Sequence, residues 1–140
     1  MADRRLIKFL EEFEAPQGIR VELLREEIVM TTSPDLVHNM IVEDVSDQIP
    51  RRRWSRLQTQ YVDMLDGGGV LLPDLVVIER GAVPDRGTRV PSEAVTASVE
   101  VVSKTSVHCD YRVKPSVYAQ ARVPAYLVID PVMAQCGLFT

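Results

Sequence analysis

Two strongly apolar runs in this chain each contain a single acidic residue. The first run, residues 70–78, is interrupted by Pro73-Asp74, and the second, residues 94–102, contains Glu100. Continuous apolar runs of this kind are typical of strands buried on both faces of a sheet. Because a carboxylate buried without a partner costs free energy, each acid needs an arginine, backbone amides or a metal ion beside it. The runs therefore predict a buried sheet that carries two partnered carboxylates.

The rest of the pattern places helices between further strand-like runs. Helical spacing of apolar residues predicts helices over residues 2–13, 33–49 and 110–122. Ser33-Pro34 is expected to start the second helix, and Asp110 to cap the third. Shorter strands are expected at residues 19–24, 28–30, 57–64 and 126–129, with another beginning at 137, and residues 79–92 are expected to form a surface loop. This order predicts an α/β domain with a central mixed sheet flanked by helices.

Length and charge narrow the class of protein. A chain of 140 residues predicts one domain, residues 1–140. No apolar run approaches the roughly 20 residues of a membrane helix, and the charged N-terminus lacks the apolar core of a secretory signal, so we expect a cytoplasmic protein with no membrane partner. The net charge of -4 argues against binding of nucleic acid through overall charge, but leaves open an enzyme with a local basic patch or a bound metal.

The two acids and a following lysine suggest a chemistry. Carboxylates of Asp74 and Glu100 on neighbouring strands would suit one hard cation, Mg²⁺ or Mn²⁺, together with a backbone carbonyl and waters. The ammonium of Lys114, on the predicted third helix, would orient an attacking water or stabilise a phosphate. The alternative is structural: Asp74 caps a turn, Glu100 is an exposed charge on an edge strand, and Lys114 lies on a helix surface.

Other polar residues have weaker claims to a site. Glu22 is either a third acid at the metal site or a surface residue that alternates with apolar neighbours. His38 is either a substrate contact or general base, or a helix residue without a role. The run Arg51-Arg52-Arg53-Trp54 is either a phosphate-contacting loop or, as the acidic composition favours, a solvated loop anchored by Trp54.

Four motifs in order carry a resemblance to a known family. They are Pro73-Asp74 with the apolar residues after it, Val99-Glu100, residues 110–119 with Lys114, and residues 123–131. Together they resemble the PD-(D/E)XK nuclease superfamily, and within it a bacterial family of restriction-endonuclease-like proteins. The resemblance implies a restriction-endonuclease-like fold and metal-dependent hydrolysis of DNA. It also implies metal binding by Asp74, Glu100 and the carbonyl of Val101, with Asp110 in support.

The chain departs from the family pattern in four places, one of which is the early hairpin, where Arg25-Glu26 replaces the family's usual glycine. Val102 stands where the superfamily lysine is expected, so Lys114 is the candidate for that role. Pro115 is tolerated only in a first helical turn, which predicts that Lys114 lies at the start of its helix. Relatives generally continue beyond the position of Thr140 with another strand or helix.

Two functional hypotheses follow from these observations. The first is a Mg²⁺- or Mn²⁺-dependent endodeoxyribonuclease that uses Asp74, Glu100 and Lys114, and that forms a homodimer because cutting both strands of a duplex usually needs two sites. The second is a nuclease-like fold that serves as a binding or assembly module without turnover. Val102 in the lysine position and the acidic composition favour the second hypothesis.

Overall fold

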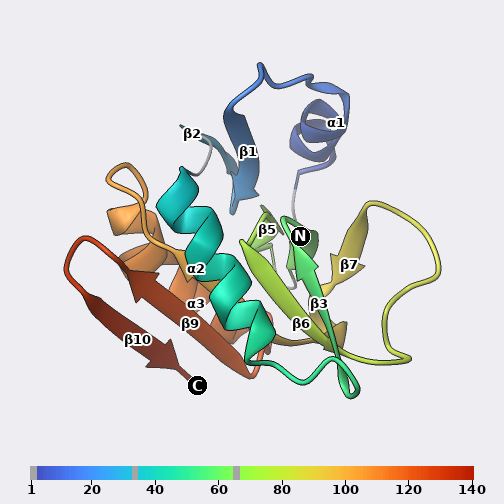
Figure 1. Ribbon diagram of the computed structural model, residues 1–140. Coiled ribbons are helices and arrows are strands. Elements are labelled where there is room, and N and C mark those ends of the chain that lie inside the picture. Colours follow the sequence, from blue (N-terminus) through green and yellow to red (C-terminus); the bar gives the residue numbers. More distant parts are fainter. Residues whose placement is uncertain (1–2, 33–34, 65–66) are drawn as a thin grey trace.

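The computed structural model describes residues 3–32, 35–64 and 67–140 (Figure 1). The expected helix start at Ser33-Pro34 lies outside the described residues. The helices are α1 (Arg4–Glu12), α2 (Leu36–Asp47) and α3 (Lys114–Gln120), with a 3₁₀ turn at Ser92–Ala94 and a π-helical turn at Cys109–Val113. The strands are β1 (Ile19–Leu24), β2 (Glu27–Thr32), β3 (Trp54–Gln58), β4 (Tyr61–Met64), β5 (Gly69–Leu71), β6 (Leu75–Glu79), β7 (Arg89–Pro91), β8 (Val95–Val101), β9 (Ala125–Asp130) and β10 (Gln135–Phe139).

The described strands form two mixed sheets of five strands each. The order in the first sheet is β2-β1-β5-β4-β7, and the order in the second is β10-β9-β8-β6-β3. Each sheet contains one parallel pair, β4 with β7 and β8 with β9, and its other pairs are antiparallel. The α/β class expected from the sequence is confirmed, but the expected single central sheet is divided into two.

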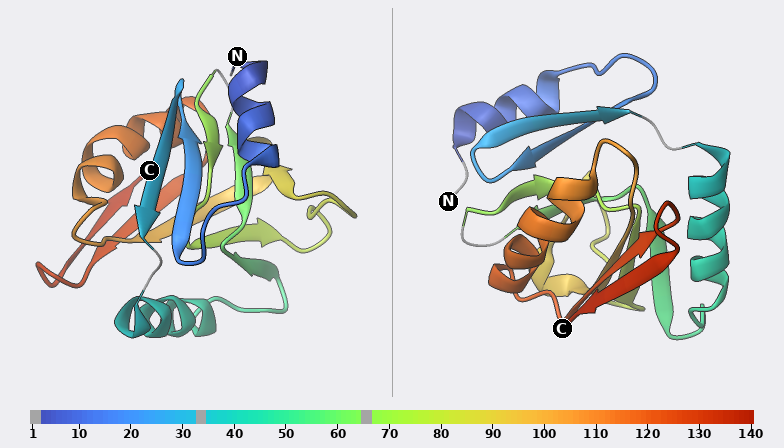
Figure 2. Two further views of the ribbon diagram at one scale, coloured as in Figure 1. Left: turned by 90° about the horizontal axis from the view of Figure 1, so that it is seen from above. Right: turned by 90° about the vertical axis from the view of Figure 1, so that its left-hand side faces the viewer.

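The second sheet separates two apolar layers. On one face, Val42 of α2 packs against Leu75, Val99 and Val101. On the other face, the larger core contains side chains from β8 and β9, from α3 and from β4 and β5 of the first sheet. Figure 2 shows α2 on one side of the second sheet, with the first sheet and α1 on the other.

Two expected strands each divide where the chain passes between sheets. Residues 57–64 form the end of β3 and all of β4, separated at Thr59, whose φ of 49° is left-handed. Residues 70–78 form β5 and β6, separated by Leu72, Pro73 and Asp74. Proline has no N–H to donate to a strand ladder, so Pro73 ends the pairing of β5. The break places Asp74 directly before β6.

The third expected helix is divided into a π-helical turn and an α-helix. Residues 109–113 form the π-helical turn, and α3 begins at Lys114, with Pro115 in its first turn as the sequence predicts. The prediction that Asp110 caps this helix is wrong, because its carboxylate accepts a hydrogen bond from Ser106 Oγ instead. The expected loop at residues 79–92 also contains β7. Within the described residues, every helix is too short or too polar to cross a lipid bilayer.

Candidate functional site

One cavity between the two sheets brings together the residues that the sequence singled out. Its lining contains the seven sequence candidates Glu22, His38, Asp74, Glu100, Val101, Asp110 and Lys114. These residues come from β1, α2, the segment before β6, β8, the π-helical turn and the first residue of α3. The acids and the lysine among them are almost completely buried. The arrangement is therefore a polar cluster inside the molecule, built from segments far apart in the sequence.

Asp74 is held by donors on both of its carboxylate oxygens. Arg20 Nη1 and His38 Nε2 lie 2.7 Å and 3.0 Å from Oδ1, and the backbone N–H of Val101 donates to Oδ2 at 2.7 Å. Burial alone would raise the pKa of Asp74. The hydrogen bond from His38 and the charge of Arg20 outweigh burial, so the pKa of Asp74 lies below its usual value. Asp74 is therefore a carboxylate stabilised in its charged form.

Glu100 occupies β8, the central strand of the second sheet, and is also held on both oxygens. Lys114 Nζ lies 2.6 Å from Oε1, and the hydroxyl of Tyr118 donates to Oε2 at 3.1 Å. Burial raises the pKa of Glu100 well above its usual value, and the neighbouring carboxylates of Asp110 and Glu22 act in the same direction against Lys114. Glu100 therefore competes with other acids for one ammonium group.

Lys114 reaches the acidic cluster because it is the first residue of α3, and α3 begins next to the cluster. Its ammonium lies 3.1 and 3.2 Å from the two carboxylate oxygens of Glu22 and 3.6 Å from Asp110 Oδ1, in addition to Glu100. Burial alone would lower the pKa of Lys114. The three carboxylates outweigh burial and raise this pKa above its ordinary value, so the lysine is charged at neutral pH.

Glu22 and Asp110 complete the surroundings of the ammonium. Glu22 Oε2 accepts a hydrogen bond of 2.6 Å from the backbone N–H of Leu72, and the side chain is buried, so its interpretation as a surface strand residue is wrong. Asp110 Oδ2 accepts a hydrogen bond of 2.6 Å from Ser106 Oγ, and burial raises the pKa of Asp110. Both acids thus belong to the buried cluster.

The structure contradicts the simple structural alternatives for the three central residues. Glu100 is 4% exposed in a central strand, Lys114 is 3% exposed, and the Asp74 carboxylate bonds to another strand rather than capping a turn. Val102, in the expected lysine position, packs in the larger core. Exposed Arg53 lies 4.8 Å above the Trp54 ring and 3.8 Å from Glu79, which agrees with the solvated-loop interpretation of the arginine run.

Three residues of the cluster were not predicted as site residues. They are Arg20, Tyr118 and Ser106. Arg20 had a usable signal, because alternate residues of a strand share one face and Arg20 lies two positions before Glu22. Tyr118 and Ser106 had none beyond the motifs around them, since their roles depend on how the π-helical turn and α3 fold over β8.

The donor chemistry of the cavity suits a hard divalent cation. Its described lining includes four carboxyl groups and two basic side chains, Arg20 and Lys114, so acidic groups are in excess. Oxygen ligands of this kind match Mg²⁺ and Mn²⁺. Within residues 3–32, 35–64 and 67–140, no group of three His, Cys, Asp or Glu side chains is arranged around one point at which a metal ion could bind. Lys114 lies between three of the acids, and Arg20 and His38 engage Asp74.

Comparison with known proteins identifies the family of this chain. A family model named Uma2 and described as "Putative restriction endonuclease" matches residues 8–140. The crystal structure of "a putative nuclease belonging to DUF820" from Anabaena variabilis ATCC 29413 matches with a TM-score of 0.68 at 15% identity, over 95% of this chain and 82% of that chain. No curated protein gave a significant match. The fold is thus restriction-endonuclease-like, and the chain belongs to the Uma2 family.

Proposed function

We propose that this protein is a metal-dependent endonuclease that hydrolyses phosphodiester bonds of DNA. The observation that carries the proposal is the buried cavity in which Asp74, Glu100 and Lys114 lie together. Two carboxylates and an ammonium held together in one cavity are suited to stabilising the charge that develops on a phosphate. Membership of a family described as "Putative restriction endonuclease" supports the same class of reaction.

Each residue of the cluster has a proposed role. Asp74, Glu100 and the carbonyl of Val101 would hold Mg²⁺ or Mn²⁺, which when bound supplies an acidified water and offsets phosphate charge. Lys114 would orient the attacking water or stabilise the phosphate through its ammonium. His38 donates to Asp74 through Nε2, which makes it a positioning residue for that carboxylate.

Further roles in the cluster concern the lysine and the substrate. Glu22 and Asp110 position the ammonium of Lys114 through the contacts described above. The excess of carboxylates would repel the phosphates of DNA, so hydrolysis needs a cation in the cavity. A homodimer, which places two sites on one duplex, stays a prediction, as does a cytoplasmic location.

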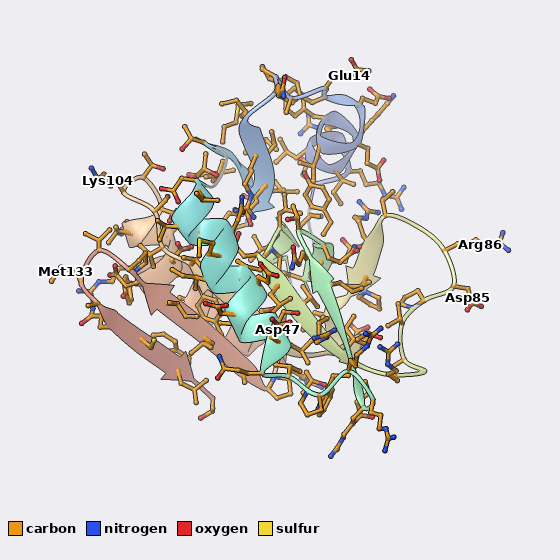
Figure 3. The ribbon with its side chains drawn as sticks, in the orientation of Figure 1. Glu14, Asp47, Asp85, Arg86, Lys104 and Met133 are labelled. Atoms are coloured by element: carbon orange, nitrogen blue, oxygen red, sulfur yellow. The ribbon has the colours of Figure 1, made fainter. Side chains whose placement is uncertain are left out.

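A plasmid-nicking assay tests the proposal. The purified protein is expected to nick supercoiled DNA with Mg²⁺ or Mn²⁺ and to be inactive in chelator. Asp74→Asn and Glu100→Gln should each abolish nicking, while Asp85→Asn, a change in an exposed loop residue (Figure 3), should have no effect. Nicking that survives both site substitutions, or that continues in chelator, would contradict the proposal.

A binding or assembly module without turnover is the second candidate function. The observation that favours it is the engagement of both Asp74 oxygens by Arg20, His38 and Val101, which leaves that carboxylate fully partnered without a metal. Calorimetric titration with Mn²⁺ separates the two candidates. A protein that binds no Mn²⁺ at millimolar concentration and nicks no DNA would be assigned to the module.

A further inference from the structure

The ammonium of Lys114 lies at the centre of three carboxylates that come from three different elements. Its Nζ is 2.6 Å from Glu100 on β8, 3.1 Å from Glu22 on β1 and 3.6 Å from Asp110 on the π-helical turn. The lysine side chain is 4% exposed, and the side chains of all three acids are no more than 8% exposed. A single monovalent charge thus occupies the centre of a buried anionic cluster.

The ammonium neutralises this cluster only in part. Three carboxyl groups share this one ammonium, so the cluster contains more acidic groups than its single cation can neutralise. Asp110 Oδ1 is buried and has no hydrogen-bond partner within the described part of the chain. Buried charges are costly unless they are paired and hydrogen-bonded. A divalent ion in contact with these carboxylates would therefore balance the charge better than the ammonium does.

We propose that Lys114 is an internal counter-cation that a divalent metal ion must displace from Glu100 before the metal can bind. The inference rests on the proposed metal-dependent function and adds a condition to it. Without metal, the ammonium holds Glu22, Glu100 and Asp110 together and stabilises the folded protein around the cavity. With metal, Glu100 exchanges the ammonium for the ion. The lysine therefore sets the metal concentration at which the site fills.

The local structure favours this exchange at Lys114 rather than at Arg20. Lys114 carries its charge on a flexible four-carbon stem and begins α3 directly after the π-helical turn, a kind of distortion frequent at functional sites. Arg20, in contrast, divides its guanidinium between Asp74 and the carbonyl of Leu72. The guanidinium of Arg20 is thus held by two different partners, whereas the ammonium of Lys114 contacts only carboxylates.

The experiment compares Mn²⁺ binding by the full chain and by Lys114→Met. Removal of the competing charge should lower the apparent dissociation constant for Mn²⁺ about tenfold or more in calorimetry. The same variant should melt at a lower temperature in chelator and gain more from added Mn²⁺ than the unsubstituted protein, because binding to the folded state raises stability. Lys8→Met, a change on the exposed surface of α1, is the matched control and should behave as the unsubstituted protein does.

A second pair of variants keeps the test valid if Lys114→Met does not fold. Glu22→Gln is compared with Lys114→Met/Glu22→Gln, which restores the net charge of the original cluster. The double variant should bind Mn²⁺ more tightly than Glu22→Gln alone. Equal or weaker binding in the variants that lack the lysine overturns the inference, whereas nicking by the unsubstituted protein would still support the proposed function.

The remaining outcomes separate the two proposals as well. If no variant binds Mn²⁺, both the inference and the metal-dependent function are wrong. If the variants without the lysine bind Mn²⁺ more tightly but the unsubstituted protein never nicks DNA, the inference holds and the proposed hydrolysis fails.

Discussion

Asp74 accepts a 2.7 Å hydrogen bond from the backbone N–H of Val101, the residue directly after Glu100. This bond joins the two acidic segments of the sequence at one end of the β6–β8 pair. Leu75 of β6 lies opposite Val99 of β8 in antiparallel register, so the residue before β6 meets the residues at the end of β8. The two carboxylates therefore enter one cavity because the chain changes sheets at Pro73.

The contact between His38 and Asp74 predicts a stabilising role for the imidazole. His38→Ala removes a donor to a buried carboxylate, and hydrogen bonds to charged groups contribute about 1.5–3 kcal/mol. We expect the free energy of unfolding to fall by about that amount in urea titrations at neutral pH. His38→Gln, whose amide is another donor, should recover part of the loss. Equal stability of His38→Ala and the unsubstituted protein would contradict this role.

The ion pair between Arg20 and Asp74 predicts a shift of acid unfolding. The pKa of Asp74 is lowered in the folded protein, so its stabilising contribution is present above the usual value of 3.8 and is lost as the pH falls through the lowered pKa. Arg20→Met removes one cause of that lowering. The variant should therefore lose stability at a higher pH than the unsubstituted protein, as followed by circular dichroism during acid titration.

Two further variants test whether this effect belongs to the ion pair. Arg86→Met changes an arginine that extends into solvent (Figure 3) and should leave the acid transition unchanged. Asp74→Asn combined with Arg20→Met should remove the additional sensitivity to acid, because no carboxylate remains to titrate. An acid transition of Arg20→Met at the original pH would show that Arg20 does not control Asp74.

The sequence predicted the acidic cluster better than it predicted the sheets. An acid within an apolar run is visible without structure, because burial of an unpaired charge is costly wherever the run folds. The division of residues 70–78 between two sheets was not visible, since apolar character is the same in both sheets and only Pro73 marks the change. The spacing of Arg20 from Glu22 was visible in the sequence, but its pairing with Asp74 was not, because the two residues are 54 positions apart.

Lys114 illustrates the other limit of sequence reasoning. Pro115 correctly predicted that the lysine begins its helix, because proline fits only the first turn. The contacts of Lys114 with Glu22 and Asp110 depend on the π-helical turn, which the sequence pattern did not predict. The tertiary packing of that turn over β8, rather than local propensity, determines which carboxylates the ammonium meets.

The buried carboxyl of Asp110 predicts a loss of stability as the pH rises. Burial raises its pKa above 3.8, so the folded protein binds more protons than the unfolded chain between that value and the raised pKa. The contribution of Asp110 to stability therefore decreases with rising pH across this window. Asp110→Asn, which cannot ionise, should show a smaller decrease in the midpoint of urea unfolding. Asp85→Asn is the exposed control, and equal slopes for the two variants would contradict the prediction.

The hydroxyl of Tyr118 is expected to set the pH at which Glu100 becomes available as a metal ligand. Its hydrogen bond to Oε2 stabilises the charged form of a carboxyl whose pKa burial has already raised. Tyr118→Phe keeps the ring in the core and removes that donor, so the pKa of Glu100 should rise further. If Mn²⁺ binds to ionised Glu100, its calorimetric binding curve should move to higher pH in this variant. Tyr111→Phe is the control, because its ring packs against the same core and its hydroxyl donates to Asp130, which lies outside the acidic cluster. A similar movement in both variants would indicate a general loosening of the core rather than control of Glu100.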